Sequence, residues 1–195
     1  MVTMGTFNVI GVSCSPRKNG NTDILIQQVL ATAAEDGAAV EFVRVSDMKI
    51  SPCDACWTCA KTGECHIEDD MQGLYPKLLH ADGIVIGSPV HMGYSVSGQA
   101  QVFLDRTFPF WHQKKLRNKV GGCVVSSNRR GGISTIRVIN GALSSHHIII
   151  AGYANGYGSA PGDVRKDERA LNEATALGKR LCELIRILRR EVFWS

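Results

Sequence analysis

The chain has 195 residues, of which 44% are hydrophobic and 21% are charged, and its formal net charge is +4 at pH 7. The length is enough for one α/β domain with a sizeable core, and the composition is that of an ordinary soluble protein. The charge is too small to indicate binding of nucleic acid. No apolar run is long enough to cross a bilayer, so we expect no membrane span.

Seven cysteines are present, and the first eight residues lack the charged flank and long apolar region of a secretory signal. Cysteines of cytosolic proteins are usually reduced. We therefore expect a cytoplasmic protein with free thiols rather than disulfides.

Apolar runs and helical patterns alternate from the start of the chain. Residues 7–12 form a short apolar run that predicts a strand, and residues 22–36 carry apolar side chains at helical spacing. A second strand is predicted at 40–45. A cysteine-rich segment follows, and a short helix is predicted over 71–79, with Asp69 or Asp70 as its N-cap.

The second half of the chain continues the alternation. Strands are predicted at 83–87, 120–126 and 147–151, and helices at 97–106, 133–143 and 164–190. Five strands with intervening helices predict a doubly wound, five-stranded parallel sheet in a three-layer α/β/α arrangement. We expect a single domain over 1–195, with a cysteine-rich insertion at about 47–70.

Ligands of such sheets bind beyond the carboxyl ends of the strands, which directs attention to the loops at 13–21, 88–97, 126–132 and 153–163. The first of these loops offers hydroxyls and backbone amides and opens a helix, which favours phosphate binding. Arg17 can add a bidentate grip.

Three rival phosphate motifs are absent. Neither a Walker loop nor a dinucleotide-binding glycine fingerprint occurs. Arg17 follows Cys14 after only two intervening residues, whereas a cysteine-based phosphatase has five. Cys14 is therefore expected to be a buried apolar filler.

The densest chemical signal is a run of four cysteines separated by two, two and five residues. Closely spaced thiolates are typical of iron–sulfur sites, whereas two distant pairs would have suggested zinc. The spacing indicates the ligands but not the metal, so a cluster, zinc and idle thiols all stay open. The four residues are Cys53, Cys56, Cys59 and Cys65.

The loop at 88–97 is rich in glycine and proline and offers backbone amides, Met92 and Tyr94 to a flat ring. His91 is the one candidate for a catalytic side chain, as a general acid, and it can equally well only pack beside a ligand. Arg129 and Arg130 are either ligand-binding cations or part of a solvated turn.

Together these segments resemble the NAD(P)H-dependent FMN reductase family, and with the cysteine run they resemble its iron–sulfur flavoprotein branch. The resemblance extends over almost the whole chain. The matching segments are the loop at 13–22, Asp69-Asp70-Met71, Gly87-Ser88-Pro89-Val90, Phe103-Leu104-Asp105-Arg106 and Leu177-Gly178-Lys179-Arg180.

The resemblance implies a flavodoxin-like fold with strand order 2-1-3-4-5 and a non-covalently bound FMN. The implied FMN contacts are Ser13, Ser15, Arg17, Asn21 and Thr22 for the phosphate, Pro89, Val90, His91, Met92, Gly93 and Ser95 along the isoalloxazine, and Ser127, Asn128, Arg129, Gly131 and Gly132 along its other edge. The four cysteines would ligate a [4Fe–4S] cluster. One departure is His91, which stands where the family often has Tyr or Phe.

We therefore expect an FMN-dependent redox protein that passes electrons between a ferredoxin-like or NAD(P)H donor and a small-molecule acceptor. One alternative is an NAD(P)H-dependent FMN or quinone reductase without a cluster, with NAD(P)H as a transient substrate. Another is a binding module that senses redox state or metal. The resemblance also implies a homodimer or homotetramer.

Overall fold

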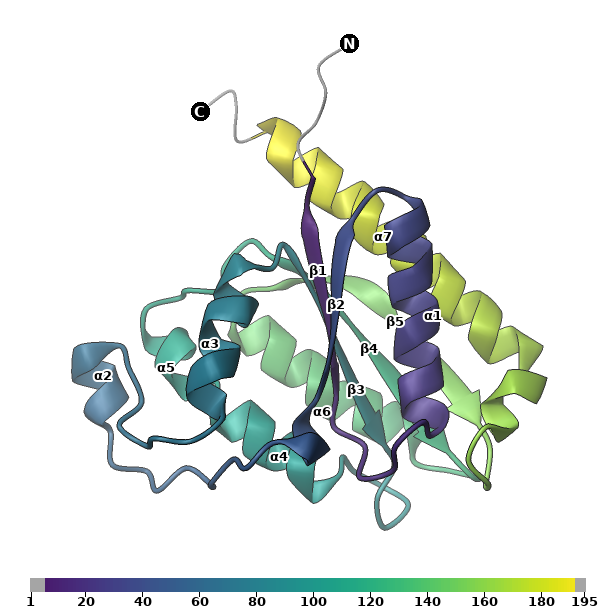
Figure 1. Cartoon of the computed structure of the whole chain (residues 1–195), viewed down its shortest axis with the longest axis horizontal. Coiled ribbons are helices and arrows are strands. Elements are labelled where there is room, and N and C mark those ends of the chain that lie inside the picture. The colour runs from purple at the N-terminus through teal and green to yellow at the C-terminus, as the bar shows by residue number, and fades with distance from the viewer. Residues whose placement is uncertain (1–5, 192–195) are drawn as a thin grey trace.

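The computed structural model describes residues 6–191, and for Arg190 and Glu191 it describes the backbone only (Figure 1). Within this range five parallel strands form one sheet in the order β2-β1-β3-β4-β5. The predicted sheet and its strand order are thereby confirmed. The strands are β1 (Asn8–Ser13), β2 (Ala39–Arg44), β3 (Gly83–Pro89), β4 (Val120–Ser127) and β5 (Ile149–Tyr157).

Helices cover both faces of the sheet (Figure 1). One face packs against α1 (Asn21–Glu35) and α7 (Glu168–Glu191). The other face packs against α3 (Met71–His80), α4 (Gly98–Asp105), α5 (Phe108–His112) and α6 (Gly132–Ser145). Three short helical segments complete the fold, namely η1 (Val45–Asp47), α2 (Thr58–Thr62) and η2 (Asp163–Lys166).

The core lies on both faces because the central strands are apolar on both sides. Val9 and Val85 pack toward α1 and α7, whereas Ile10 and Ile84 pack toward the opposite helices. The two helices of the first face approach closely at Gly178, where an added Cβ would lie 2.7 Å from the carbonyl oxygen of Val29. Burial of this kind supplies most of the driving force for folding.

Two predicted boundaries are wrong. The last strand is not 147–151 but runs to Tyr157, because β5 pairs with β4 well beyond its apolar run. The closing helix does not begin at 164. It begins at Glu168, because the carboxylate of Asp167 accepts the backbone N–H of Ala170 and a separate 3₁₀ turn precedes it.

The short helices α2 and α5 were not predicted, and they contact each other beside the cysteine run. Between residues 6 and 191, no helix combines the length and apolar character that a bilayer crossing requires. The prediction that the chain carries no secretory signal rests partly on residues 1–5, which lie outside the described range.

Candidate functional site

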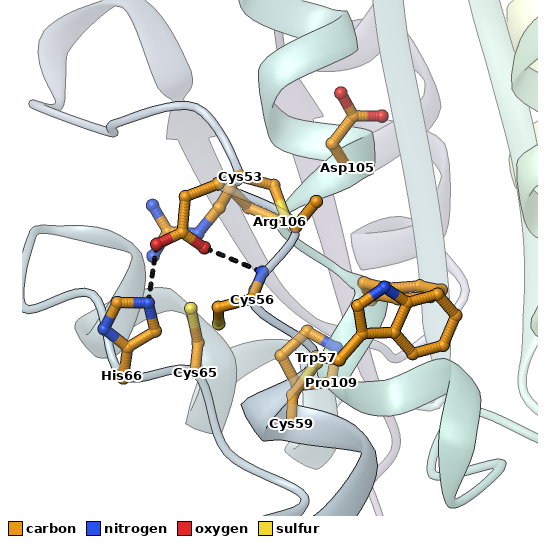
Figure 2. Close-up of a pocket in the computed structure, with 12 residues that line it drawn as sticks. Cys53, Cys56, Trp57, Cys59, Cys65, His66, Asp105, Arg106 and Pro109 are labelled. Atoms are coloured by element: carbon orange, nitrogen blue, oxygen red, sulfur yellow. Dashed lines mark hydrogen bonds and ion pairs between the residues drawn. The ribbon is translucent and has the colours of Figure 1, made fainter.

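The four cysteines of the run line one hollow, which we call the cysteine pocket (Figure 2). They come from the connection between η1 and α3, and the end of α4 and the start of α5 form the opposite wall. The structure thus brings together all four predicted metal ligands. The lining residues are Cys53, Asp54, Ala55, Cys56, Trp57, Cys59, Cys65, His66, Asp105, Arg106, Phe108 and Pro109.

The thiols of the pocket differ in exposure and influence one another. Cys59 is buried, Cys65 is half-buried, and Cys53 and Cys56 are exposed. Burial raises the pKa of the Cys59 thiol, and the negative charges of Cys65, Cys53 and Cys56 raise it further. Thiolate sulfur is the usual ligand of iron–sulfur clusters, so four thiols around one pocket form a donor set that fits a metal centre.

The backbone of the pocket adopts an uncommon conformation on both sides of Cys56. Ala55 and Trp57 have φ values of 57° and 60°, in the left-handed region that non-glycine residues rarely occupy. Trp57 is also the N-cap residue of α2, and its side chain makes no capping hydrogen bond. Conformations of this kind cost about 1–2 kcal/mol each, and they cluster at ligand sites.

The exposed residues Asp54 and His66 also line the pocket, and Figure 2 shows His66 beside Cys65. Asp54 Oδ2 lies 2.9 Å from His66 Nε2, and Asp54 Oδ1 accepts the backbone N–H of Cys56 at 3.2 Å. One ligand atom from each of Asp54, Cys56 and His66 falls within 4.8 Å of the others. His66 directly follows Cys65 in the sequence, whereas Asp54 was not among the predicted ligands.

A buried ion pair closes the base of the cysteine segment. Arg106 Nη1 donates to Asp69 Oδ2 at 2.6 Å and to the Ser51 carbonyl at 2.7 Å, and Nη2 donates to Asp69 Oδ1 at 3.1 Å. Asp69 also accepts the backbone N–H groups of Ser51 and Met71. Burial alone would raise the pKa of Asp69, but the hydrogen bond from Arg106 and the backbone donors outweigh it and lower the pKa.

Asp69 thus holds the first turn of α3, as one of the two predicted capping residues. The residue in the N-cap position is Asp70, whose carboxylate instead accepts the backbone N–H of Lys49 at 2.6 Å. Both aspartates therefore connect α3 to the start of the cysteine segment.

The predicted phosphate loop leads from β1 into α1, at the tips of the strands. Gly20 occupies the N-cap position, so no side chain caps the first-turn amides of α1. Arg17 is exposed, and its Nη1 donates to the Ser159 carbonyl at 3.3 Å. Ser15 is buried, and its Oγ accepts the backbone N–H of Arg17 at 3.2 Å. Uncapped amides beside a cation suit an anion.

The other three predicted phosphate residues have side-chain partners inside the protein. Ser13 Oγ donates to Asp23, and Thr22 Oγ1 lies 2.8 Å from Ser126 Oγ. The Asn21 amide donates to carbonyls of the loop after β5 and accepts the N–H of Val164. These side chains hold the loops together, so a phosphate would meet these residues through their backbone.

The loops after β3 and β4 touch each other at two glycines. Met92 and Gly93 form a tight turn with φ values of 51° and 75°, closed by the His91 N–H donating to the Ser95 carbonyl at 2.8 Å. Gly131 has φ 87°, and an added Cβ there would lie 2.4 Å from the Gly93 carbonyl oxygen. A side chain at this position would therefore push the two loops apart.

The remaining predicted contacts line the same edge of the sheet. Ser127 and Gly132 are buried, whereas Asn128 and Arg129 are exposed, as is His91. The side chains of Met92 and Tyr94 are 88% and 65% exposed, so this loop presents free surface. Pro89, Val90, Gly93, Ser95 and Gly131 are half-buried.

Two buried oxygens at the strand tips lack a hydrogen-bond partner among the described residues. They are Ser127 Oγ, at the end of β4, and Asn155 Oδ1, near the end of β5. Buried polar atoms are rarely left unpaired, so this edge fits a polar ligand that reaches between the loops. Asn155 lies within the loop predicted at 153–163, but it was not among the predicted cofactor contacts, and in the structure it belongs to β5.

Comparisons with known proteins agree with this geometry. The NADPH-dependent FMN reductase family matches residues 7–159. An iron–sulfur flavoprotein of Methanocaldococcus jannaschii is 38% identical over 192 residues, which cover 93% of this chain and 99% of that protein. An iron–sulfur flavoprotein of Archaeoglobus fulgidus is 34% identical over 175 residues, which cover 89% of this chain and 78% of that protein.

Among solved structures, RosB with a bound 8-demethyl-8-formylriboflavin-5′-phosphate intermediate has a TM-score of 0.78 at 19% identity. The alignment covers 95% of this chain and 81% of that chain, and it supports the fold alone. The chain therefore belongs to the NADPH-dependent FMN reductase family and is an FMN-dependent oxidoreductase.

Proposed function

We propose that the protein is an iron–sulfur flavoprotein that passes electrons between a ferredoxin-like or NAD(P)H donor and a small-molecule acceptor. It would hold FMN at the strand tips and a [4Fe–4S] cluster in the cysteine pocket. The observation that carries the proposal is that Cys53, Cys56, Cys59 and Cys65 line one hollow. The names of the two relatives described above point in the same direction.

FMN would be held by groups that have no partner, or only some of their possible partners, among the described residues. The first-turn amides of α1 and the Arg17 guanidinium would bind the phosphate. The orphaned oxygens of Ser127 and Asn155 would face the polar parts of the cofactor. Backbone amides of the loops at 89–95 and 127–132 would stabilise negative charge on the ring. His91 remains a candidate general acid.

When bound, FMN would supply hydride and single-electron chemistry, and a cluster would supply single-electron transfer. The chain's own part is to position both groups. Cys59 and Cys65 anchor the buried side of the pocket, whereas Cys53 and Cys56 close it from the exposed side.

The proposal includes a homodimer or homotetramer in the cytoplasm. Large apolar side chains are exposed in both candidate sites, with Trp57 59% exposed at the cysteine pocket and Tyr94 at the strand tips. Exposed aromatic side chains are typical of protein interfaces. They support association with a second copy or with a protein electron donor.

A second candidate is an NAD(P)H-dependent FMN or quinone reductase without a cluster, which the name of the matching family favours. A third is a sensor of redox state or metal, favoured by the exposure of Cys53 and Cys56. In both cases the cysteine pocket would take no part in turnover with NAD(P)H.

The test compares wild-type protein, Cys56→Ser and the control Cys182→Ala, all purified without air. Cys182 is buried on α7, outside the pocket. Iron and FMN contents and electron transfer from reduced ferredoxin are measured. We expect Cys56→Ser to lose iron and ferredoxin-driven transfer while it retains FMN, and the control to keep all three. Undiminished NAD(P)H oxidation in an iron-free wild type would favour the reductase, and failure to take up added FMN would favour the sensor.

A further inference from the structure

Arg106 is a buried cation on the wall of the cysteine pocket, only 1% exposed (Figure 2). It follows the last residue of α4, so its backbone is fixed by that helix. A charge removed from water acts on its neighbours far more strongly than an exposed one. Any charge change inside the pocket would therefore be felt at this side chain.

Within residues 6–191, the guanidinium of Arg106 uses its two terminal nitrogens as hydrogen-bond donors but not its Nε. Its two terminal nitrogens donate to the Asp69 carboxylate and to the carbonyls of Ser51 and Ile67. The Nε atom is buried and has no partner among the described residues. An arginine can donate five hydrogen bonds, so this N–H is the donor left over.

An unpaired buried donor costs free energy, and it calls for an acceptor that the described residues do not provide. Two carboxylates of the pocket already have partners: Asp54 contacts Cys56 and His66, and Asp105 Oδ1 accepts from Gln101. The cysteine sulfurs that line the same pocket as Arg106 are further acceptors.

We propose that Arg106 is a positioning residue of the metal centre, which donates its Nε–H to a sulfur there and sets the reduction potential through its buried charge. The inference rests on the proposed function, because it requires a cluster in the pocket. Hydrogen bonds to sulfur and local charge are the levers by which a protein tunes such a potential.

The ion pair offers a test that depends on sign. One-electron reduction adds one negative charge to the cluster. Arg106 stabilises that charge, and Asp69 opposes it. Arg106→Gln and Asp69→Asn break the same ion pair, so a purely structural role would affect both variants alike. If the pair tunes the cluster, the two variants shift its reduction potential in opposite directions.

The experiment measures the midpoint potentials of cluster and flavin by anaerobic spectroelectrochemical titration. Two further variants serve as controls. Arg106→Lys keeps the charge but removes the Nε–H, which separates the two contributions. Asp105→Asn neutralises an exposed carboxylate on the same pocket, where water screens the charge.

We expect a more negative cluster potential in Arg106→Gln, a more positive one in Asp69→Asn and a smaller negative shift in Arg106→Lys. Asp105→Asn is expected to move the cluster potential less than Asp69→Asn, and the flavin potential should move little in any variant. Shifts of equal sign in Arg106→Gln and Asp69→Asn, or no shift in either, would overturn the inference.

A measurement on the wild type covers the case in which the variants do not fold or lose the cluster. Protein labelled with ¹⁵N only in arginine is reduced, and its electron spin echo spectrum is searched for coupling between ¹⁵N and the cluster. Coupling is expected, and its absence in a loaded wild type would overturn the inference while leaving the proposed function intact. A wild type without a cluster would overturn both.

Discussion

The strand-tip site and the cysteine pocket are built in different ways. At the strand tips the side chains of Ser13, Asn21 and Thr22 already have partners inside the protein, so the loops are held before a ligand arrives. The cysteine pocket has exposed thiols and the left-handed residues Ala55 and Trp57. The first site is therefore preorganised, whereas the second depends on what its thiols bind.

This difference also shows in how each site is connected to the sheet. The strand-tip loops leave β1, β3, β4 and β5 directly. The cysteine segment is held at its base by the Arg106–Asp69 pair, with the Lys115 ammonium donating to the Gly63 carbonyl at 2.9 Å farther along. We infer that the two sites can be damaged independently.

The largest effect is expected for loss of a pocket thiol. Cys59→Ser should abolish retention of the cluster, because Cys59 is the most buried of the four ligands. FMN content should stay at the wild-type level. Iron, acid-labile sulfide and flavin analysis of air-free protein measures both, and joint loss of flavin and iron would show that the sites are one folding unit.

Arg106→Gln is expected to lower the free energy of unfolding by about 3–5 kcal/mol, because it leaves the Asp69 carboxylate buried without its partner. Urea unfolding followed by circular dichroism measures the change. Lys77→Gln is the matched control, since the Lys77–Glu41 pair is exposed and its loss should cost less than about 1 kcal/mol. Equal losses of unfolding free energy in the two variants would contradict a stabilising role for the buried Arg106–Asp69 ion pair.

Arg17→Ala should weaken FMN binding by roughly 1.5–3 kcal/mol, because a charge-assisted grip on the phosphate is lost. Fluorescence titration of flavin-free protein measures the dissociation constant. Lys18→Ala is the control, because Lys18 is exposed and pairs with Asp47 instead. Unchanged affinity in Arg17→Ala would refute the role of the guanidinium.

Gly131→Ala should cost about 1–2 kcal/mol through its positive φ, in addition to the contact with the Gly93 carbonyl. We expect weaker FMN binding with an unchanged iron content. Gly141→Ala on α6 is the matched control, since its Cβ meets nothing within 4 Å and alanine favours the helix. A normal flavin affinity in Gly131→Ala would show that the contact between the loops is dispensable.

The smallest effect concerns an ion pair at the end of the sheet opposite the strand tips, where Asp36 after α1 pairs with Arg186 on α7. The hydrogen bond from Arg186 lowers the pKa of Asp36, so the stabilisation is present above the unfolded pKa of about 3.9 and is lost as the pH falls through the lowered folded pKa. Asp36→Asn should therefore cost less than about 1 kcal/mol at pH 7. Urea unfolding should show this difference closing in acid, whereas a difference independent of pH would contradict the ion pair.

The sequence predicted the sheet well, and it singled out four cysteines that the structure places around one pocket, because both features depend on local patterns. Continuous apolar runs such as that before Gly87 predict parallel strands, and close cysteine spacing predicts a shared site. The Arg106–Asp69 pair could not be predicted, since it joins residues that only the folded chain brings together. Asn155 lies in the loop predicted at 153–163 but was not singled out, since its place at the strand tips depends on the pairing of β5 with β4.

The most direct test of the two-site account is the visible spectrum of freshly purified, air-free wild-type protein, together with its iron and FMN contents. We predict flavin bands above a broad iron–sulfur absorbance, with one FMN and about four irons per chain. Flavin bands alone, with no iron in protein that was never exposed to air, would contradict the account.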